Sequence, residues 1–242
     1  MKNYLKDTAL LNYREQSIVN LIDSQNWNNL NEFDKIGAIY DYVQNVILLG
    51  YNKYDNLTAT QVIADGLGQC NTKATLLMAL LRAVSIPCRL HGTKVTKVFQ
   101  RSLMSKFMAK LAPPLIVHTW AEVYYNGEWL SLEGVITDKA YISGVQKLFP
   151  KCKGKFFDYA IAVKDFGNLQ IDWKGENTTV QQQAVVEDLG VFDTPDEFYS
   201  EYKQTYRGLK KFTYENIGRK IMTKKVAKIR QGKIKNSTKI RE

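Results

Sequence analysis

Hydrophobic side chains in the first quarter of the chain recur at spacings of three and four, the spacing typical of an amphipathic helix. They follow Asn31, a residue type that often caps helices, and occupy positions 33, 36, 39, 40, 43 and 47. This pattern predicts a scaffold helix. A shorter helix is predicted from Thr60 to Asp65, and Gly66 ends it because glycine readily adopts a positive φ.

Residues 71–85 are apolar on nearly every side of a helix and are rich in strong helix formers. They predict a central, buried helix that Pro87 ends. Cys70 lies at the N-terminus of this helix, after the closely spaced Gly66 and Gly68. The following segment, "CRLHGTKVTKVF" from Cys88, predicts a strand.

Residues 116–125 alternate between apolar and polar, and the sequence Asn126-Gly127 is the dipeptide that a two-residue type I′ turn prefers. The segment "EWLSLEG" is therefore predicted to return antiparallel, with Tyr125 paired to Glu128. Continued along the strand, this register places position 135 opposite His118. Glu133 then lies two positions away on the same face of the sheet.

Three predictions cover the rest of the chain. Residues 156–163, "FFDYAIAV", predict another strand of the same sheet. Asp193 to Tyr206 predicts a helix that begins with Thr194 and Pro195 as an N-cap and first-turn pair. The remaining sequence has weak helical periodicity to about Ile229.

The net charge of +10 is concentrated at the C-terminal end. Residues 203–242 contain 14 Lys or Arg and two Glu, a net charge of +12, whereas residues 1–202 carry −2. We therefore expect a domain over 1–202 and a basic C-terminal extension over 203–242. The extension is interpreted as a solvated, partly helical appendage or as an attachment to a polyanion, either nucleic acid or an anionic membrane surface.

Composition favours a soluble globular protein, with 45% hydrophobic and 24% charged residues. The first residues contain no apolar run of signal-peptide length, and the longest apolar run, "LLMALL", is too short to cross a bilayer. The three cysteines, at positions 70, 88 and 152, form no disulfide framework. A cytoplasmic protein without a transmembrane segment is expected.

A cysteine at a helix N-terminus feels the positive end of the helix dipole, which favours the nucleophilic thiolate. A base is also needed, and the chain has two histidines, His91 and His118. His118 and Glu133 share a face of the predicted hairpin, where Glu133 can orient the imidazole as the acid of a triad does. Asp138 is the fallback acid if a bulge changes the register. The alternative interpretation is that Cys70 and His118 are structural.

The segments "GLGQCNTKATLLMALLRAVSIPCRLHG" and "VHTWAEVYYNGEWLSLEG" resemble the transglutaminase-like superfamily. The resemblance covers residues 58–137 and implies an α+β papain-like core, in which a helix that begins at the cysteine packs on an antiparallel sheet. A helical N-terminal region and a basic C-terminal helix complete the expected fold. By the same resemblance Cys70 is the nucleophile, His118 the base and Glu133 the acid. Backbone N–H groups near Cys70, with Gln69, Asn71 and Trp120, are the candidates for binding the oxyanion or positioning the substrate.

The chain departs from the family pattern at two positions. Glu133 stands where the family usually has Asp, and Asn71 stands where members that crosslink proteins usually have Trp. The expected activity is therefore cysteine-dependent hydrolysis of an amide in a peptide or protein, through a thioester and without a cofactor. The alternatives are an amine-accepting transferase and a catalytically silent binding module tethered by the basic tail.

Two other motifs bear on the chemistry of the chain. Cys88 and His91 form a C-x-x-H pair, but no second cluster accompanies it, so no metal is expected. Residues 99–112 carry apolar side chains at every fourth position, interspersed with Arg101, Lys106 and Lys110. This insertion is interpreted as a surface helix packed on the core, as a lid or groove wall over the site, or as an interfacial membrane helix.

Overall fold

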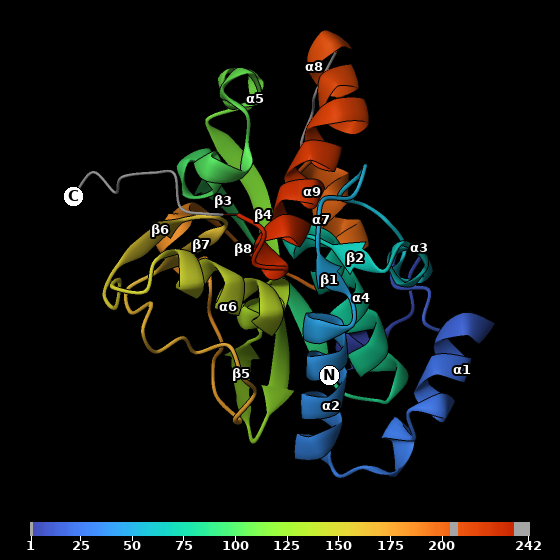
Figure 1. The fold of residues 1–242 in the computed structure, drawn as a ribbon. Coiled ribbons are helices and arrows are strands. Elements are labelled where there is room, and N and C mark those ends of the chain that lie inside the picture. Colours follow the sequence, from blue (N-terminus) through green and yellow to red (C-terminus); the bar gives the residue numbers. More distant parts are fainter. Residues whose placement is uncertain (1, 204–207, 235–242) are drawn as a thin grey trace.

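A four-stranded antiparallel sheet lies at the centre of the molecule, and helices pack around it (Figure 1). The computed structural model describes residues 2–203 and 208–234. The sheet has the order β5-β4-β3-β8, with β3 Cys88–Thr96, β4 Leu115–Tyr125, β5 Glu128–Ser131 and β8 Val185–Phe192. The mixed helical and sheet architecture agrees with the predicted α+β class.

The helices before the sheet form a layer on one of its faces. They comprise the helical turns η1 Lys2–Leu5 and η2 Trp27–Asn29 and the α-helices α1 Gln16–Ser24, α2 Glu32–Asn45, α3 Ala59–Asp65 and α4 Cys70–Ala83. As predicted, Asn31 caps α2 by accepting the N–H of Asp34, and α3 ends at Gly66 with φ of 62°. Helix α4 is buried along nearly its whole length between β4 and the helices α2 and α3. The central-helix prediction is confirmed.

The hairpin β4–β5 has the predicted turn and register. Asn126 and Gly127 both have positive φ, 48° and 87°, as a type I′ turn requires. Tyr125 pairs with Glu128, and the register continues to Glu122 opposite Ser131. Strand β5 ends there, so Glu133 lies in a 3₁₀ turn, η4 Glu133–Ile136, and not in the strand.

The predicted strand over 156–163 is wrong in its pairing. It is a separate hairpin of β6 Phe156–Asp158 and β7 Ile161–Val163, which turns at Tyr159 and Ala160 with φ of 54° and 58°. The fourth strand of the main sheet is instead β8, which the sequence analysis did not predict. A further pair, β1 Leu48–Leu49 and β2 Leu67–Gly68, is parallel and brings the start of α4 beside the end of α2.

The segment after the hairpin continues through α6 Lys139–Leu148, the 3₁₀ turn η5 Gln182–Ala184 and α7 Pro195–Glu201. Thr194 caps α7 by accepting the N–H of Glu197, as the sequence predicts. The helix ends earlier than predicted, and residues 204–206 lie outside the described part of the chain.

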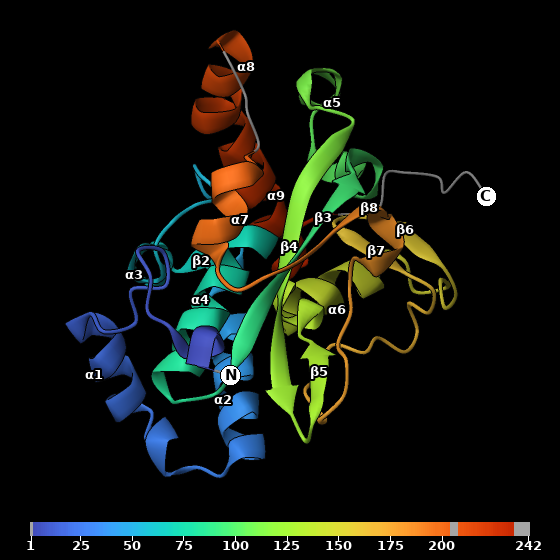
Figure 2. The ribbon, with the colours of Figure 1, turned by 180° about the vertical axis from the view of Figure 1, so that it is seen from behind.

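Two arms project from the same end of the molecule (Figures 1 and 2). One is the insertion between β3 and β4, with the 3₁₀ helix η3 Lys97–Leu103 and the helix α5 Lys106–Leu111. The other is the C-terminal helix, which consists of α8 Gly208–Thr213, the π-helical turn η6 Tyr214–Gly218 and α9 Arg219–Arg230.

Helix α9 packs against α6, with Met222, Val226 and Ile229 buried. The described part of the basic segment is therefore joined to the core, whereas the polyanion role predicted for residues 203–242 stays a prediction. Residues 235–242 lie outside the described chain. Across the described ranges, no helix combines the length and apolar character that a membrane span needs.

Candidate active site

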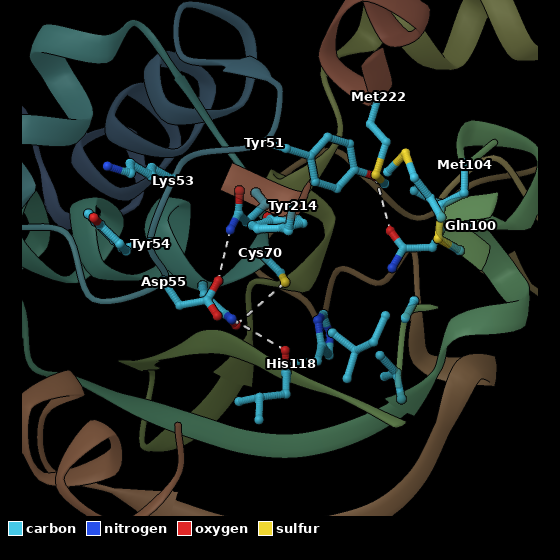
Figure 3. Close-up of a pocket in the computed structure, with 18 of the residues that line it drawn as sticks. Tyr51, Lys53, Tyr54, Asp55, Cys70, Gln100, Met104, His118, Tyr214 and Met222 are labelled. Carbon is cyan, nitrogen blue, oxygen red and sulfur yellow. Dashed lines mark hydrogen bonds between the residues drawn. The ribbon is translucent and has the colours of Figure 1, made fainter. Parts of the chain in front are cut away.

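Cys70 is the first residue of α4, and the backbone before it is tightly folded. A β-carbon on Gly68 would lie 2.7 Å from the Lys73 side chain and 2.9 Å from Thr72 Oγ1. The same Thr72 hydroxyl accepts the N–H of Gln69 at 3.1 Å. The glycine is required at position 68 because the chain passes so close to the first turn of the helix. This close packing fixes the position of Cys70, which lines a cavity (Figure 3).

Asn71 fastens the start of α4 to the strand that carries His118. Its Nδ2 donates to the backbone carbonyl of Val117 at 3.3 Å, and its Oδ1 accepts the hydroxyl of Thr119 at 3.1 Å. The Cys70 thiol also lies 3.5 Å from the same Oδ1. Because these contacts are to the residues on either side of His118, Asn71 fixes the position of Cys70 relative to that histidine.

His118 and Glu133 meet in the interior of the molecule. His118 Nε2 lies 3.1 Å from Glu133 Oε1, and both side chains are almost completely buried. The hairpin register brings the two residues near each other, but the 3₁₀ turn after β5 provides the final approach. With Nε2 directed at Glu133, the other ring nitrogen, Nδ1, remains for Cys70.

The Glu133 carboxylate is held by a segment far along the chain. Its Oε2 accepts the backbone N–H groups of Val180 at 2.9 Å and Gln181 at 3.1 Å. The neighbouring Gly134 donates its N–H to Thr178 Oγ1 at 3.1 Å. These bonds fix the carboxylate without the regular strand pairing that the sequence predicts.

The electrostatic surroundings of His118 favour the imidazolium. Burial by itself lowers the pKa of His118, but Cys70 and Glu133 act against burial and raise the pKa to about 10. Hydrogen bonding and charge contribute from both partners. A protonated imidazole between a thiol and a carboxylate is the arrangement that stabilises a thiolate–imidazolium pair.

Gln69 is bound to the loop that precedes α3. Its Oε1 accepts the N–H of Asn52 at 2.6 Å, and its Nε2 donates to Asp55 Oδ1 at 2.8 Å. Burial raises the pKa of the Asp55 carboxyl, and hydrogen bonds from Gln69 and Asn71 partly offset that rise. These contacts make Gln69 a link between the loop and the start of α4. The oxyanion role of Gln69 stays a prediction.

Trp120 lies beside the catalytic candidates but does not line the cavity. Its indole packs against His118 at 5.6 Å between ring centroids and stacks on His91 at 4.4 Å. The indole supports the buried face of the His118 ring, and direct positioning of a substrate by Trp120 stays a prediction. His91 belongs to a separate cluster, in which its ring nitrogens contact Glu122 at 2.7 Å and Asp188 at 2.9 Å.

The fallback acid, Asp138, lies at the start of α6 and does not contact His118. Its carboxylate caps α6 by accepting the N–H of Tyr141 and forms an ion pair with Arg230 at 2.6 Å. The Arg230 guanidinium and two backbone N–H groups hold the pKa of Asp138 below its usual range, although burial acts in the opposite direction. Asp138 therefore joins the C-terminal helix to the core, and we withdraw it as a candidate acid.

A cavity of about 320 Å³ opens beside Cys70 and His118. Helix α5 and the C-terminal helix both contribute to its wall, with Met108 and Leu111 from the first and Tyr214 and Met222 from the second. The insertion over 99–112 is thus a wall of the cavity, which agrees with the groove interpretation. Motion of this segment as a lid stays a prediction.

No group of three or more metal-ligating side chains occurs within residues 2–203 and 208–234. The C-x-x-H pair separates in the sheet, because Cys88 is buried and directed at the carbonyl of Met78 whereas His91 faces Glu122. The sequence analysis missed two parts of the site. These are the Val180–Gln181 backbone and the C-terminal wall, and neither carries a local motif.

The fold and the site define an α+β protein in which a cysteine at a helix start, a strand histidine and a carboxylate come together. Residues 20–134 match the family model described as the transglutaminase-like superfamily, which supports the resemblance seen in the sequence. The match supports, at the level of the family, a cysteine-dependent enzyme of the transglutaminase-like kind.

No curated protein matches the chain. One similar solved structure is the crystal structure of a "Putative Cysteine Protease" from Cytophaga hutchinsonii, with 17% sequence identity and a TM-score of 0.45. The match covers 80% of this chain and 47% of that one, so the chain spans about half the length of that structure.

Proposed function

We propose that the chain hydrolyses an amide bond in a peptide or protein, with Cys70 as the nucleophile, His118 as the general base and acid, and Glu133 as the residue that orients His118. The observation that carries this proposal is the burial of His118 between Cys70 and Glu133, with its pKa raised by both. The match of residues 20–134 to the transglutaminase-like family model supports the same chemistry.

The reaction follows from these positions. The Cys70 thiolate attacks the carbonyl carbon, and the carbonyl oxygen takes the negative charge beside the first N–H groups of α4, which have no partner within the helix. His118 gives its proton to the leaving nitrogen as the carbon–nitrogen bond breaks, which leaves a thioester on Cys70. A water molecule then attacks the thioester while His118 takes its proton, and the acid is released as the carbon–sulfur bond breaks.

A primary amine in place of water would make the enzyme a transferase. Asn71 occupies the position at which crosslinking members usually have Trp, and it is committed to Val117 and Thr119. We therefore propose water as the acceptor. Adding a primary amine to the reaction separates the two, because a transferase yields the amide of the added amine.

The test is the rate of Cys70 alkylation by iodoacetamide from pH 5 to pH 11, in a protein with Cys88→Ser and Cys152→Ser. We expect rapid alkylation at neutral pH and a marked slowing in His118→Ala. Because the pKa of His118 is raised to about 10, hydrolytic activity should fall as the pH rises through that value. A thiol that reacts only after unfolding, or equally fast without His118, would support the binding-module alternative.

A further inference from the structure

The cavity beside Cys70 has two chemically different ends. Charged and polar side chains line one end, with Lys53, Asp55 and Glu215 among them. The other end is built largely from apolar side chains, among them Phe99, Met104, Met108, Leu111 and Met222. Figure 3 shows Cys70 and His118 between the two, with Lys53 and Asp55 on one side and Met104 and Met222 on the other.

The apolar end is assembled from segments far apart in the sequence. Met108 of α5 packs against Gly218 of the π-helical turn, where a β-carbon would lie 2.6 Å from the Met108 methyl group. Methionine side chains are unbranched and fill irregular spaces, so a wall rich in methionine adapts to apolar groups of different shape. Because π-helical turns occur frequently at functional sites, the placement of Tyr214 and Glu215 on the cavity wall is consistent with a binding role.

A buried hydrogen-bond acceptor lies next to this wall. The Gln181 side chain is 3% exposed, and its Nε2 donates to the carbonyl of Ala160 at 2.8 Å. Ala160 in turn donates its N–H to the carbonyl of Phe99 at 2.9 Å. These two bonds fix the orientation of the Gln181 amide beside the apolar end.

Within the described residues, Gln181 Oε1 has no hydrogen-bond partner, and Gln181 lines the cavity. The backbone N–H of the same residue binds Glu133, so the free acceptor is close to the candidate triad. An unpaired acceptor in a buried position is costly, and a substrate donor that pairs with it gains selectivity over one that does not.

We infer that the substrate is a peptide amide with a bulky apolar side chain, such as that of Leu, Met or Phe, on the residue beside the scissile bond. The apolar wall binds this side chain, and Gln181 Oε1 accepts the N–H of the same residue. The identity of the broken bond, an amide, rests on the proposed function. The apolar character of the bound side chain rests on the cavity alone.

N-alkyl iodoacetamides test the apolar end, because their reaction with Cys70 requires no amide hydrolysis. We compare N-methyl and N-hexyl iodoacetamide on the protein with Cys88→Ser and Cys152→Ser, each rate divided by that with free cysteine. The hexyl reagent should react at least tenfold faster. Leu111→Glu should abolish that advantage, whereas Phe107→Glu, on the same helix but exposed and outside the cavity lining, should retain it.

N-hexyl-N-methyl iodoacetamide tests the acceptor because it lacks the amide N–H. The protein with Gln181 intact should react about fivefold more slowly with it than with the N-hexyl reagent, a difference typical of one hydrogen bond. Gln181→Met has a similar volume and no acceptor, and it should treat the two reagents alike. Equal rates for the two reagents when Gln181 is intact would remove Gln181 from the inference.

Failure of the inference and failure of the proposed function give different results. Rapid alkylation with no dependence on chain length overturns the inference and leaves the nucleophile in place. If Cys70 does not react, the proposed function fails, and binding to Cys70→Ala still decides the inference. N-hexylacetamide should then bind at least tenfold more tightly than N-methylacetamide, measured by NMR titration, and equal affinities would overturn the inference.

Discussion

Arg230 and Asp138 form a two-point ion pair that joins the C-terminal helix to the start of α6. Arg230 Nε lies 2.9 Å from Asp138 Oδ1, and Nη2 lies 2.6 Å from Oδ2. The same guanidinium donates to the carbonyl of Leu49 at 3.1 Å. Because Asp138 is buried, this pair positions α9, and with it Met222 of the cavity wall.

Arg230→Ala should lower the free energy of unfolding by about 3–5 kcal/mol at pH 7, since it leaves a buried carboxylate without its cation. Urea unfolding measures the change, and Lys228→Ala, an exposed change on the same helix, should stay within about 0.5 kcal/mol of the unsubstituted protein. The pKa of Asp138 is lowered in the folded state. The stability it contributes is therefore present above its unfolded pKa and is lost as the pH falls through the folded value. An effect of Arg230→Ala as small as that of Lys228→Ala would contradict a structural role for the pair.

Glu133→Gln should slow hydrolysis about 10²- to 10⁴-fold, because the neutral amide no longer stabilises the imidazolium or selects its tautomer. The matched control is Glu122→Gln. Glu122 contacts His91 at 2.7 Å in a similar carboxylate–imidazole pair away from the cavity, and its loss should leave kcat nearly unchanged. If both substitutions slow the reaction equally, the assignment of Glu133 as the orienting acid is wrong.

Gly134→Ala should displace the turn that carries Glu133. The added carbon would lie 2.6 Å from the Tyr40 hydroxyl, 2.9 Å from Thr178 Cβ and 3.0 Å from the Ile171 backbone, so the turn has to move. We expect lower thermal stability and a lower kcat together. Gly154→Ala, where nothing lies within 4 Å of the new carbon, should change neither, and an unchanged kcat in Gly134→Ala would show that the turn tolerates displacement.

Lys73→Met should change how the free energy of unfolding depends on pH. Lys73 is completely buried in α4, and burial lowers its pKa to about 7, with Asp138 and Arg230 acting in opposite directions. Between pH 7 and about 10.5 the unfolded chain binds more protons at this residue than the folded one, so Lys73 makes stability rise with pH.

His118 acts in the opposite sense to Lys73. Its pKa is raised to about 10, so its contribution to stability is full below about 6.5 and is lost as the pH rises to 10. Relative to the unsubstituted protein, which retains the same His118, the stability gained by Lys73→Met should be largest near pH 6 and shrink toward pH 10. Urea unfolding across that range measures the gain. A gain independent of pH would mean that Lys73 remains protonated in the folded protein.

The sequence was most informative where local chemistry decides structure. The Asn126-Gly127 turn determined both the hairpin and the register that brings His118 near Glu133, because two positive φ angles leave few other turn types. The start of α4 at Cys70 followed in the same way from closely spaced glycines and a buried helical pattern. These features depend on neighbours within a few residues.

The features that the sequence did not predict depend on distant parts of the chain. Strand β8 is largely exposed and acidic, and its pairing with β3 is irregular near Gly190, which has φ of 86°, so it lacks the apolar alternation of a half-buried strand. The residues 156–163 have suitable strand composition, but Tyr159 and Ala160 turn the chain back on itself. Likewise, no local pattern indicates that Val180 and Gln181 bind Glu133.

The residues that line the cavity extend from Leu49 to Met222 in the sequence. During synthesis, its parts are therefore made at different times. Cys70 and His118 leave the ribosome well before the helix that carries Tyr214 and Met222. A partly made chain therefore contains Cys70 before it can form the complete cavity. Under the proposed function, the substrate cavity is completed only after the C-terminal helix, which supplies Tyr214 and Met222, has been made.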